Sequence, residues 1–307
     1  VFQLGNRLFG KLETYPMHNY PLFLNVASTI LYLPLCFVYI IPAMLFTNNI
    51  SKEALEIPQH KFAIMGALDS IAGIMQTFSI NFISNASMIV LVQQSAIPIS
   101  MAVSRLFLQA RYSTAQYTGA GIVLLGIVAV LIPNFIGSGA SGADSSSGEL
   151  VWYLVMILSC IPSVLSSVYK EKALGEVEVD IIYLNGMVAV YQTLFALPLC
   201  LPSAGLINIP ISEIPTNLFH GLLCWGGENS ITDNSYAHSG PDNCSTAPWF
   251  VSLYFFFNIG YNMLTILILK HGSANILWLA STIIVPLSNV AFSLQIVPGH
   301  QPMKFMD

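Results

Sequence analysis

The chain has 307 residues, of which 55% are hydrophobic and only 8% are charged, and its formal net charge is −5. Soluble domains carry roughly 25% charged residues, so this composition excludes an ordinary soluble fold. A negative net charge without a basic patch also argues against nucleic-acid binding. We therefore expect one membrane-embedded domain over residues 1–307.

Eight apolar stretches, separated by polar gaps, are each long enough to cross a bilayer as a helix. A hydrocarbon core about 30 Å thick needs roughly 20 helical residues, so the pattern predicts an all-α, multi-pass membrane protein. The stretches are Leu22–Leu45, Phe62–Ile83, Ser87–Ser104, Gln116–Pro133, Leu150–Tyr169, Ile181–Pro202, Trp249–Leu269 and Ala274–Gln295. Val1–Phe9 has the character of the end of a ninth span, so we expect a fragment whose targeting signal cannot be assessed.

The distribution of Lys and Arg between alternate gaps predicts the orientation of the chain. One set of gaps holds Lys52, Lys61, Arg105, Arg111, Lys170, Lys172 and Lys270. The opposite set holds Arg7, Lys11 and Lys304. Because cytoplasmic loops are enriched in basic residues, the first set is predicted to face the cytosol. Chance placement of few charges is the alternative.

Asp69 is the only acidic residue well inside a predicted span. An ionised Asp at the centre of a membrane helix costs about 2.5–3.5 kcal/mol, so this side chain should face a wet cavity, find a partner or be protonated. Since burial disfavours the charged form, we predict that Asp69 lines a transport pathway and exchanges protons. A structural Asp bonded to a neighbouring helix is the alternative.

The fourth predicted span contains Gly119, Gly121 and Gly126, which we assign to close helix packing. The Gly/Ser-rich segment 134–149 follows it and is predicted to be a flexible, solvated linker. This linker separates a first repeat, 1–133, from a second, 150–307.

A repeat is predicted because Ser95-Ala96-Ile97-Pro98-Ile99-Ser100 has a counterpart in Ile283-Ile284-Val285-Pro286-Leu287-Ser288. With the missing ends restored, the count fits five helices followed by five, the first partial and the tenth absent. Such inverted repeats place a substrate site near the midplane, which either side can expose. Pro98 and Pro286 are thus candidates for helices that bend between open states, although membrane prolines also serve packing.

Other polar residues of the spans are predicted to line the same pathway. Gln93 and Gln94 precede Pro98, and Ser281 and Thr282 occupy the equivalent positions of the second half; all four bind substrate or join helices by hydrogen bonds. Arg7 could attract an anionic group or extend to the interface. The full predicted set is Asn6, Arg7, Asp69, Gln93, Gln94, Pro98, Asn185, Gln192, Ser281, Thr282 and Pro286.

The long connection 203–248 contains Cys224 and Cys244, two of the five cysteines. On the non-cytosolic side of a membrane, such a pair predicts a disulfide that closes the loop. Two free thiols are the alternative. A metal site is less favoured, because His220 and His238 lack compact ligand spacing. No metal or other cofactor is expected.

Several short motifs, taken together and in chain order, resemble one known family. They are Asn6-Arg7-Leu8-Phe9 with Lys11-Leu12, Gln94-Ser95 with Ile97-Pro98, Lys170-Glu171, Asp180 with Leu184-Asn185, and Leu279-Ala280-Ser281-Thr282 with Val285-Pro286. The chain resembles the chloroquine-resistance-transporter-like proteins of the drug/metabolite transporter superfamily over nearly its whole length.

The resemblance implies ten helices in two inverted repeats and carriage of small organic solutes across a vacuolar or plastid membrane. It implies thiol peptides such as glutathione for plant-type members, and amino acids, short peptides or cationic drugs with proton coupling for parasite-type members. It assigns Arg7 and Asp69 to the cavity, and Cys224 with Cys244 to a lumenal disulfide. The extra loop cysteines of parasite-type members are absent here, which leaves the subgroup open.

We therefore expect a monomeric secondary transporter, not an enzyme, with a small-molecule substrate, membrane lipid and protons as partners. A passive channel and an intramembrane enzyme are the alternatives. An intramembrane aspartyl protease needs two membrane aspartates, and no His-Glu-x-x-His or Gly-x-Ser-x-Gly motif is present. Saturable flux that a counter-substrate stimulates would distinguish a carrier from a channel.

Overall fold

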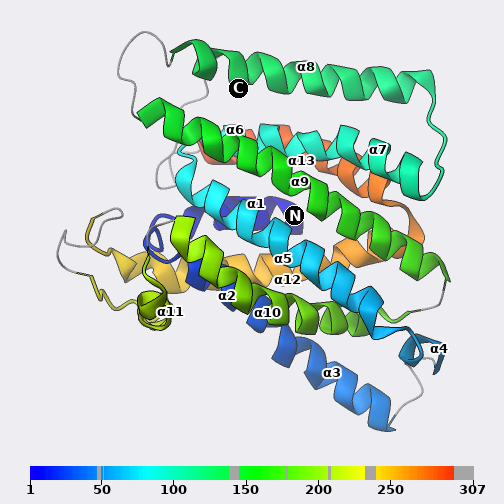
Figure 1. The fold of residues 1–307 in the computed structure, drawn as a ribbon, viewed down its shortest axis with the longest axis horizontal. Coiled ribbons are helices and arrows are strands. Elements are labelled where there is room, and N and C mark those ends of the chain that lie inside the picture. The colour runs from blue at the N-terminus through cyan, green and yellow to red at the C-terminus, as the bar shows by residue number, and fades with distance from the viewer. Residues whose placement is uncertain are drawn as a thin grey trace.

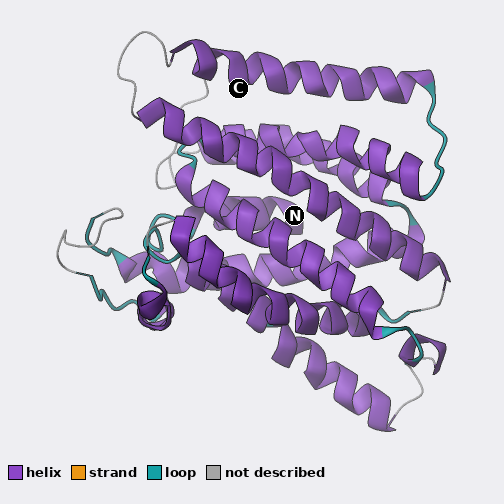
Figure 2. Ribbon diagram, viewed as in Figure 1, coloured by secondary structure: helices purple, strands orange, loops and turns teal. Residues whose placement is uncertain are grey.

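The computed structural model describes residues 1–46, 50, 52–137, 145–176, 179–206, 209–231 and 240–293. Within these ranges the chain is helical, without any strand (Figure 2). The α-helices are α1 (Phe2–Leu12), α2 (Pro21–Ile30), α3 (Tyr32–Phe46), α4 (Lys52–Leu55), α5 (Gln59–Phe82), α6 (Ala86–Val92), α7 (Ala96–Phe107), α8 (Thr114–Gly137), α9 (Ser145–Glu176), α10 (Ile181–Leu206), α11 (Ile214–Trp225), α12 (Ala247–His271) and α13 (Ala274–Ser293). Three short 3-10 segments accompany them: η1 (Gln93–Ser95), η2 (Ile211–Glu213) and η3 (Cys244–Thr246).

The predicted all-α membrane architecture is confirmed. In the part of the chain that the structure describes, eight helical stretches are long and apolar enough to cross a membrane, and each overlaps one predicted span. Two spans are composite: α2 and α3 together form the first, and α6, η1 and α7 the third. The predicted end of the last span, Gln295, lies outside the described residues.

Local sequence sets several helix starts. The Asn85 side chain accepts a hydrogen bond from the Met88 backbone N–H at 3.2 Å and so caps α6. At α10 the Asp180 Oδ1 atom accepts from the backbone N–H groups of Ile182 and Tyr183, both at 2.9 Å. Side-chain acceptors of this kind satisfy amide groups that have no partner within the helix.

The helices form one bundle in which elements far apart in the sequence lie side by side (Figure 1). Helix α5 packs along both α9 and α10, while α1 packs along α12 and also contacts α13. Helix α8 lies at one edge of the bundle and α3 at the opposite edge (Figure 1). Helices α4 and α11 lie at opposite ends, so the connections gather at two faces, as alternating spans require. Which of these faces the cytosol stays a prediction.

Close approach of α5 and α10 depends on a glycine. A Cβ atom at Gly66 would lie 2.7 Å from the backbone N atom of Gln192, closer than non-bonded atoms can pack. By contrast, a Cβ atom at Gly119, Gly121 or Gly126 of α8 would meet no atom of the described residues within 4 Å. Their assignment to close helix packing within the chain is therefore wrong, because α8 runs along the outside of the bundle.

The predicted connection 203–248 is largely ordered. Helix α10 continues to Leu206, and α11 folds within the connection and packs against α2 and α12. The predicted disulfide is present between Cys224, near the end of α11, and Cys244, at the start of η3. The predicted linker is also shorter than 134–149, since α8 ends at Gly137 and α9 begins at Ser145; residues 138–144 lie outside the described part.

Asp242 fixes this connection to the turn between α1 and α2. Its carboxylate accepts hydrogen bonds from the Tyr20 hydroxyl at 2.6 Å and the Asn19 amide at 2.9 Å. The backbone N–H groups of Ile231 and Ser230 donate to it at 2.8 and 3.1 Å. Burial alone would raise the pKa of Asp242, but these hydrogen bonds outweigh it and hold the pKa below its ordinary value.

Candidate functional site

A polar cavity of about 290 Å³ lies inside the bundle, between helices that are apolar on their outer faces. Residues of α1, α2, α5, α6, α9, α10, α12 and α13 line it, so both predicted halves of the chain contribute. Six of the predicted pathway residues are in this lining: Asn6, Arg7, Asp69, Gln93, Asn185 and Gln192. The spans thus turn their few polar side chains towards one shared space.

The remaining predicted residues lie outside the lining of this cavity: Gln94, Pro98, Ser281, Thr282 and Pro286. The Ser281 and Thr282 hydroxyls donate to the Trp278 and Leu279 carbonyls of their own helix, each at 2.6 Å. Pro98 is half-buried and Pro286 is exposed. Their helices, α7 and α13, pack directly against each other. The structure therefore brings the two motif-bearing helices together, but with both prolines beside the cavity instead of within it.

Pro98 follows the irregular segment of the third span. A proline has no backbone N–H, so the carbonyl of Gln94, four residues earlier, lacks its usual helical donor. The segment Gln93–Ser95 is a 3-10 turn between α6 and α7. Gln93, within this turn, lines the cavity, and the Gln94 amide donates to the Val90 carbonyl at 3.2 Å. The irregular turn thus lies at the cavity wall.

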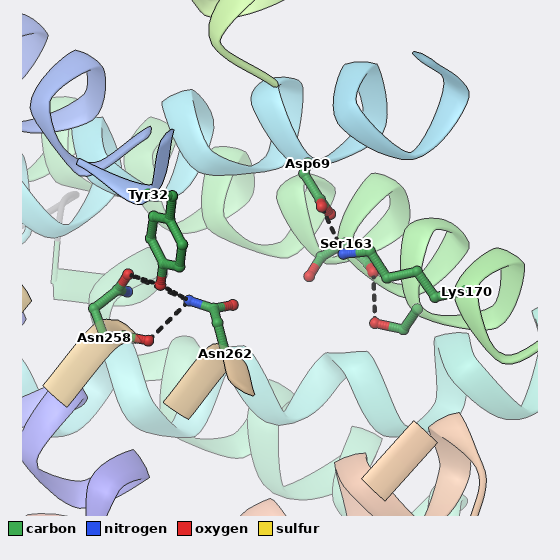
Figure 3. Close-up of polar contacts among 7 residues, drawn as sticks. Tyr32, Asp69, Ser163, Lys170, Asn258 and Asn262 are labelled. Atoms are coloured by element: carbon green, nitrogen blue, oxygen red, sulfur yellow. Dashed lines mark hydrogen bonds and ion pairs between the residues drawn. The ribbon is translucent and has the colours of Figure 1, made fainter. Parts of the chain in front are cut away.

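Asp69 of α5 forms an ion pair with Lys170 of α9, with 2.6 Å between Oδ2 and Nζ (Figure 3). Both side chains line the cavity and are largely buried, at 20% and 14% exposed. Sequence analysis counted Lys170 among the charges of a gap; in the structure α9 continues to Glu176, and Lys170 is part of the cavity lining. Asp69 lies at a polar cavity and has a charged partner, whereas proton exchange stays a prediction.

A hydrogen-bonded group of asparagines was missed by sequence analysis. The Tyr32 hydroxyl, at the start of α3, donates to Asn258 Oδ1 and accepts from Asn262 Nδ2, both at 2.7 Å (Figure 3). The Asn258 amide also donates to Asn6 Oδ1 at 3.0 Å. Two asparagines four residues apart in the apolar stretch Trp249–Leu269 were the available signal, since residues i and i+4 share a helix face.

Arg7 provides a cation whose hydrogen-bonding capacity is incompletely used. Its Nη1 atom is buried and has no hydrogen-bond partner among the described residues. Nearby acceptors and donors on the same cavity wall belong to Tyr261 of α12 and Cys160 of α9. A guanidinium with a free N–H donor in a cavity is suited to bind a carboxylate or another anionic group.

Glu13 is a second acidic residue of the cavity that sequence analysis did not single out. It follows the last residue of α1, lines the cavity, and is only 4% exposed. Burial raises the pKa of this carboxyl well above its ordinary value. The apolar stretch Val1–Phe9 ends before Glu13, so hydropathy placed this residue in a solvated gap.

The lining can thus bind a small polar solute through amides, hydroxyls and a cationic donor. In the described ranges, no group of three or more His, Cys, Asp or Glu side chains is arranged to hold a metal ion. Lys11, also in the lining, donates to the carbonyl oxygens of Ile80 at 2.9 Å and Ile83 at 2.7 Å, at the end of α5. These features are those of a solute-binding cavity within a membrane bundle.

Comparison with known proteins gives consistent relatives. A family model described as CRT-like, chloroquine-resistance transporter-like, matches residues 1–307. The chain is 32% identical to "Chloroquine resistance transporter" of Toxoplasma gondii over 317 residues, which cover 100% of the chain and 35% of that relative. It is 33% identical to "Crt homolog 3" of Dictyostelium discoideum over 307 residues, covering 94% of the chain and 62% of the relative.

A chloroplast protein is also similar. "Protein CLT3, chloroplastic" of Arabidopsis thaliana is 29% identical over 318 residues, which cover 100% of the chain and 67% of that protein. The chain therefore spans about a third to two thirds of the length of these relatives.

Proposed function

The chain belongs to the CRT-like family, and from this premise we propose that it is a secondary active transporter that carries small organic solutes across an organelle membrane by alternating access. The observation that carries the proposal is the polar, charged cavity enclosed by helices suited to span a membrane. The chloroquine resistance transporter name of the Toxoplasma relative supports a transport role.

The proposed substrates are thiol peptides such as glutathione, amino acids, short peptides or cationic drugs. A cavity of about 290 Å³ suits a small solute, since ligand pockets are commonly about 300–1,000 Å³. Arg7 would bind a carboxylate of such a solute through its unpaired Nη1 donor. The amides of Asn6, Gln93, Asn185 and Gln192 would orient the rest of the solute by hydrogen bonds.

For the transport cycle we propose the ten-helix, five-plus-five inverted repeat, with Pro98 and Pro286 as bending points of α7 and α13. The matched proline motifs, the 3-10 turn before Pro98 and the packing of α7 on α13 support this role. In this proposal Gln94, Ser281 and Thr282 take part when the helices bend, since their polar groups lie next to the bending points. Exchange between the two open states would then rock one half against the other.

The proposal includes proton coupling, with Asp69 as the acid that the sequence indicates. Its ion pair with Lys170 supports a role in the cycle, because each charge could be released when solute or a proton takes the partner's place. The proposed setting is a vacuolar or plastid membrane with the disulfide-bonded connection in the lumen. A chloroplastic relative is consistent with an organelle. We propose that the protein acts as a monomer.

The test is solute flux in proteoliposomes that contain the purified full-length protein. Glutathione, glycine, a dipeptide and chloroquine would be assayed at pH 5 and pH 7. A carrier gives saturable uptake, and solute on the opposite side accelerates it. Flux that neither saturates nor responds to counter-solute would instead support the passive-channel alternative.

Two variants sharpen this test. Arg7→Gln removes the cationic donor from the cavity, whereas Arg105→Gln changes an exposed cation outside it. Hydrogen bonds to charged groups contribute about 1.5–3 kcal/mol, so glutathione uptake should fall roughly tenfold or more in the first variant. Uptake should be unchanged in the second. Equal uptake by both variants would remove Arg7 from the proposed binding site.

A further inference from the structure

Glu13 is a buried acid of the cavity that the proposed pathway does not use. It lies directly after α1, in the turn that leads to α2, and outside the candidate membrane spans. Its side chain lines the cavity and is 4% exposed. Its Oε2 atom is buried and finds no hydrogen-bond partner among the residues that the structure describes.

Several titratable or charged side chains share the cavity with Glu13. The other titratable or charged side chains of the cavity lining are Arg7, Lys11, Tyr32, Asp69, Cys160, Lys170, Tyr254 and Tyr261. Glu13 interacts electrostatically with the Tyr254 hydroxyl of α12. Lys11 Nζ donates to the Ile80 and Ile83 carbonyl oxygens, and Lys170 to Asp69.

Glu13 is also separated along the chain from Arg7, the third cationic side chain of the lining. Arg7 lies six residues earlier along α1, which corresponds to about 9 Å along a helix axis. His18, in the same turn, has its Nδ1 atom 3.0 Å from the Tyr15 carbonyl oxygen. Glu13 is therefore buried near a phenol, and its Oε2 atom has no hydrogen-bond donor in the described part of the chain. A carboxylate in such a place is much less stable than the neutral acid, and burial accordingly raises its pKa.

Asp69 is in the opposite situation. Lys170 Nζ lies 2.6 Å from its Oδ2 atom, so this carboxyl has a cationic partner. Asp69 also lies deeper: it precedes Ile80, which Lys11 contacts near Glu13, by eleven residues of α5, or roughly 16 Å of helix. The cavity thus has one acid that is paired with a cation and another whose buried Oε2 atom has no hydrogen-bond partner among the described residues.

We propose that Glu13 is the proton-binding residue of the cavity, which holds a proton in the arrangement seen here and releases it to water on the side of the α1–α2 turn. The inference rests on the proposed transport function and names the residue that couples it to protons. The O–H bond of the carboxylic acid breaks, the proton passes to water, and a carboxylate remains. The Asp69–Lys170 ion pair takes no part in this step.

The net charge of the cavity lining links this proton to the binding of a solute. With Glu13 neutral, the lining carries three cationic side chains, Arg7, Lys11 and Lys170, against one anionic side chain, Asp69. Ionisation of Glu13 adds a second negative charge. An anionic solute therefore binds better when Glu13 is protonated, and by linkage the bound solute strengthens proton binding. The proton and an anionic solute would move in the same direction.

Infrared spectroscopy of the purified full-length protein tests the assignment without any solute. The carbonyl stretch of a protonated carboxylic acid should be present at pH 7 in the wild type, and Glu13→Gln should remove one such band. Asp69→Asn should leave that band in place. Glu228→Gln, which changes an exposed glutamate of the connection after α11, is the matched control and should also leave it in place.

If Glu13→Gln does not fold, isotope labelling of the wild type and of Glu13→Asp provides the test instead. In wild-type protein, carbon-13 labelling of glutamate should shift the band, whereas labelling of aspartate should not; Glu13→Asp should transfer its sensitivity to the aspartate label. A band that persists in folded Glu13→Gln, or that disappears in Asp69→Asn, would overturn the proposal. So would a wild-type band that responds only to labelled aspartate.

The same variants separate failure of this inference from failure of the transport function. If glutathione counterflow is saturable but the acid band does not depend on Glu13, the carrier stands and the proton assignment is wrong. If the band depends on Glu13 but no tested solute is exchanged, the proton site stands and the carrier is wrong. When both hold, Glu13→Gln should lose the stimulation of glutathione uptake by a pH gradient, whereas Glu228→Gln should keep it.

Discussion

The cavity contains two carboxyl groups, those of Asp69 and Glu13, and their surroundings differ. Asp69, within α5, has a lysine from another helix at 2.6 Å. Glu13, after α1, has a buried oxygen without a hydrogen-bond partner in the described part of the chain. Asp69 therefore has a counter-ion, whereas burial raises the pKa of Glu13 and favours its neutral form.

The difference teaches that depth in the membrane does not by itself decide the protonation of an acid. Hydropathy marks Asp69 as the exceptional residue, because it interrupts an apolar stretch. The structure supplies that residue with its counter-ion and leaves Glu13, in a turn, without one. The protonation of each carboxyl group depends on the side chains that neighbouring helices place beside it.

The largest effect is expected from removing the counter-ion. Lys170→Met leaves the Asp69 carboxylate without its partner inside a span, and breaking a buried ion pair costs about 3 kcal/mol or more. Thermal unfolding in detergent should show the loss. The double variant Lys170→Met with Asp69→Asn should recover most of it, because no unpaired charge remains. Equal stability of the single and double variants would mean that the pair does not hold Asp69 ionised.

A second variant disturbs only the Asp69 side of the comparison. Gly66→Ala would put a methyl group 2.7 Å from the Gln192 backbone N atom and push α5 from α10. Overpacking of this kind costs about 1–3 kcal/mol. Gly121→Ala is the matched control, since no atom lies within 4 Å there, and should change stability by about 0.5 kcal/mol or less. The Glu13 infrared band should be unchanged in both.

Asp242 offers a satisfied carboxylate for contrast with Glu13. Asp242→Asn removes a charged acceptor of four hydrogen bonds and should cost about 2 kcal/mol at pH 7. The pKa of Asp242 is lowered, so its stabilisation is full above the unfolded value of about 3.9 and is lost as pH falls through the folded pKa.

Unfolding at pH 7, 5 and 3 would check this. The wild type and Asp242→Asn should differ equally at pH 7 and 5 and converge towards pH 3. Asn243→Ala, at an exposed neighbouring position, should follow the wild type throughout. A difference that is already lost at pH 5 would show that the four hydrogen bonds do not outweigh burial.

The last prediction concerns the pH dependence of stability at Glu13. Burial raises the pKa of Glu13, so above the unfolded value of about 4.3 the folded protein binds a proton that the unfolded chain has released. Stability therefore falls as pH rises, by up to about 1.4 kcal/mol per pH unit, until the folded pKa is reached. Glu13→Gln should remove this slope between pH 5 and 7, and Glu228→Gln should keep it. An unchanged slope in Glu13→Gln would mean that Glu13 is ionised in the folded protein.

Particular residues show how much of the fold and of the site could be predicted from the sequence. Asn6, Arg7, Asp69 and Gln192 were selected because polar groups in apolar spans must face a partner or a cavity, and they do line one. The helical course of 214–225 was missed because this segment lies between spans and was treated as a loop. Lys170 was assigned to a gap because the apolar stretch ends before it, whereas helix α9 continues beyond it to Glu176.

The sequence by itself determined the number and approximate limits of the apolar spans, and it indicated the Cys224–Cys244 pair. These follow from hydropathy and composition, which are properties of a local stretch of chain. Only the tertiary structure decided that Lys170, 101 residues from Asp69, is its counter-ion, and that Glu13 is enclosed in the same cavity. Such pairings depend on which faces the helices turn towards one another, and that is set by packing across the whole bundle.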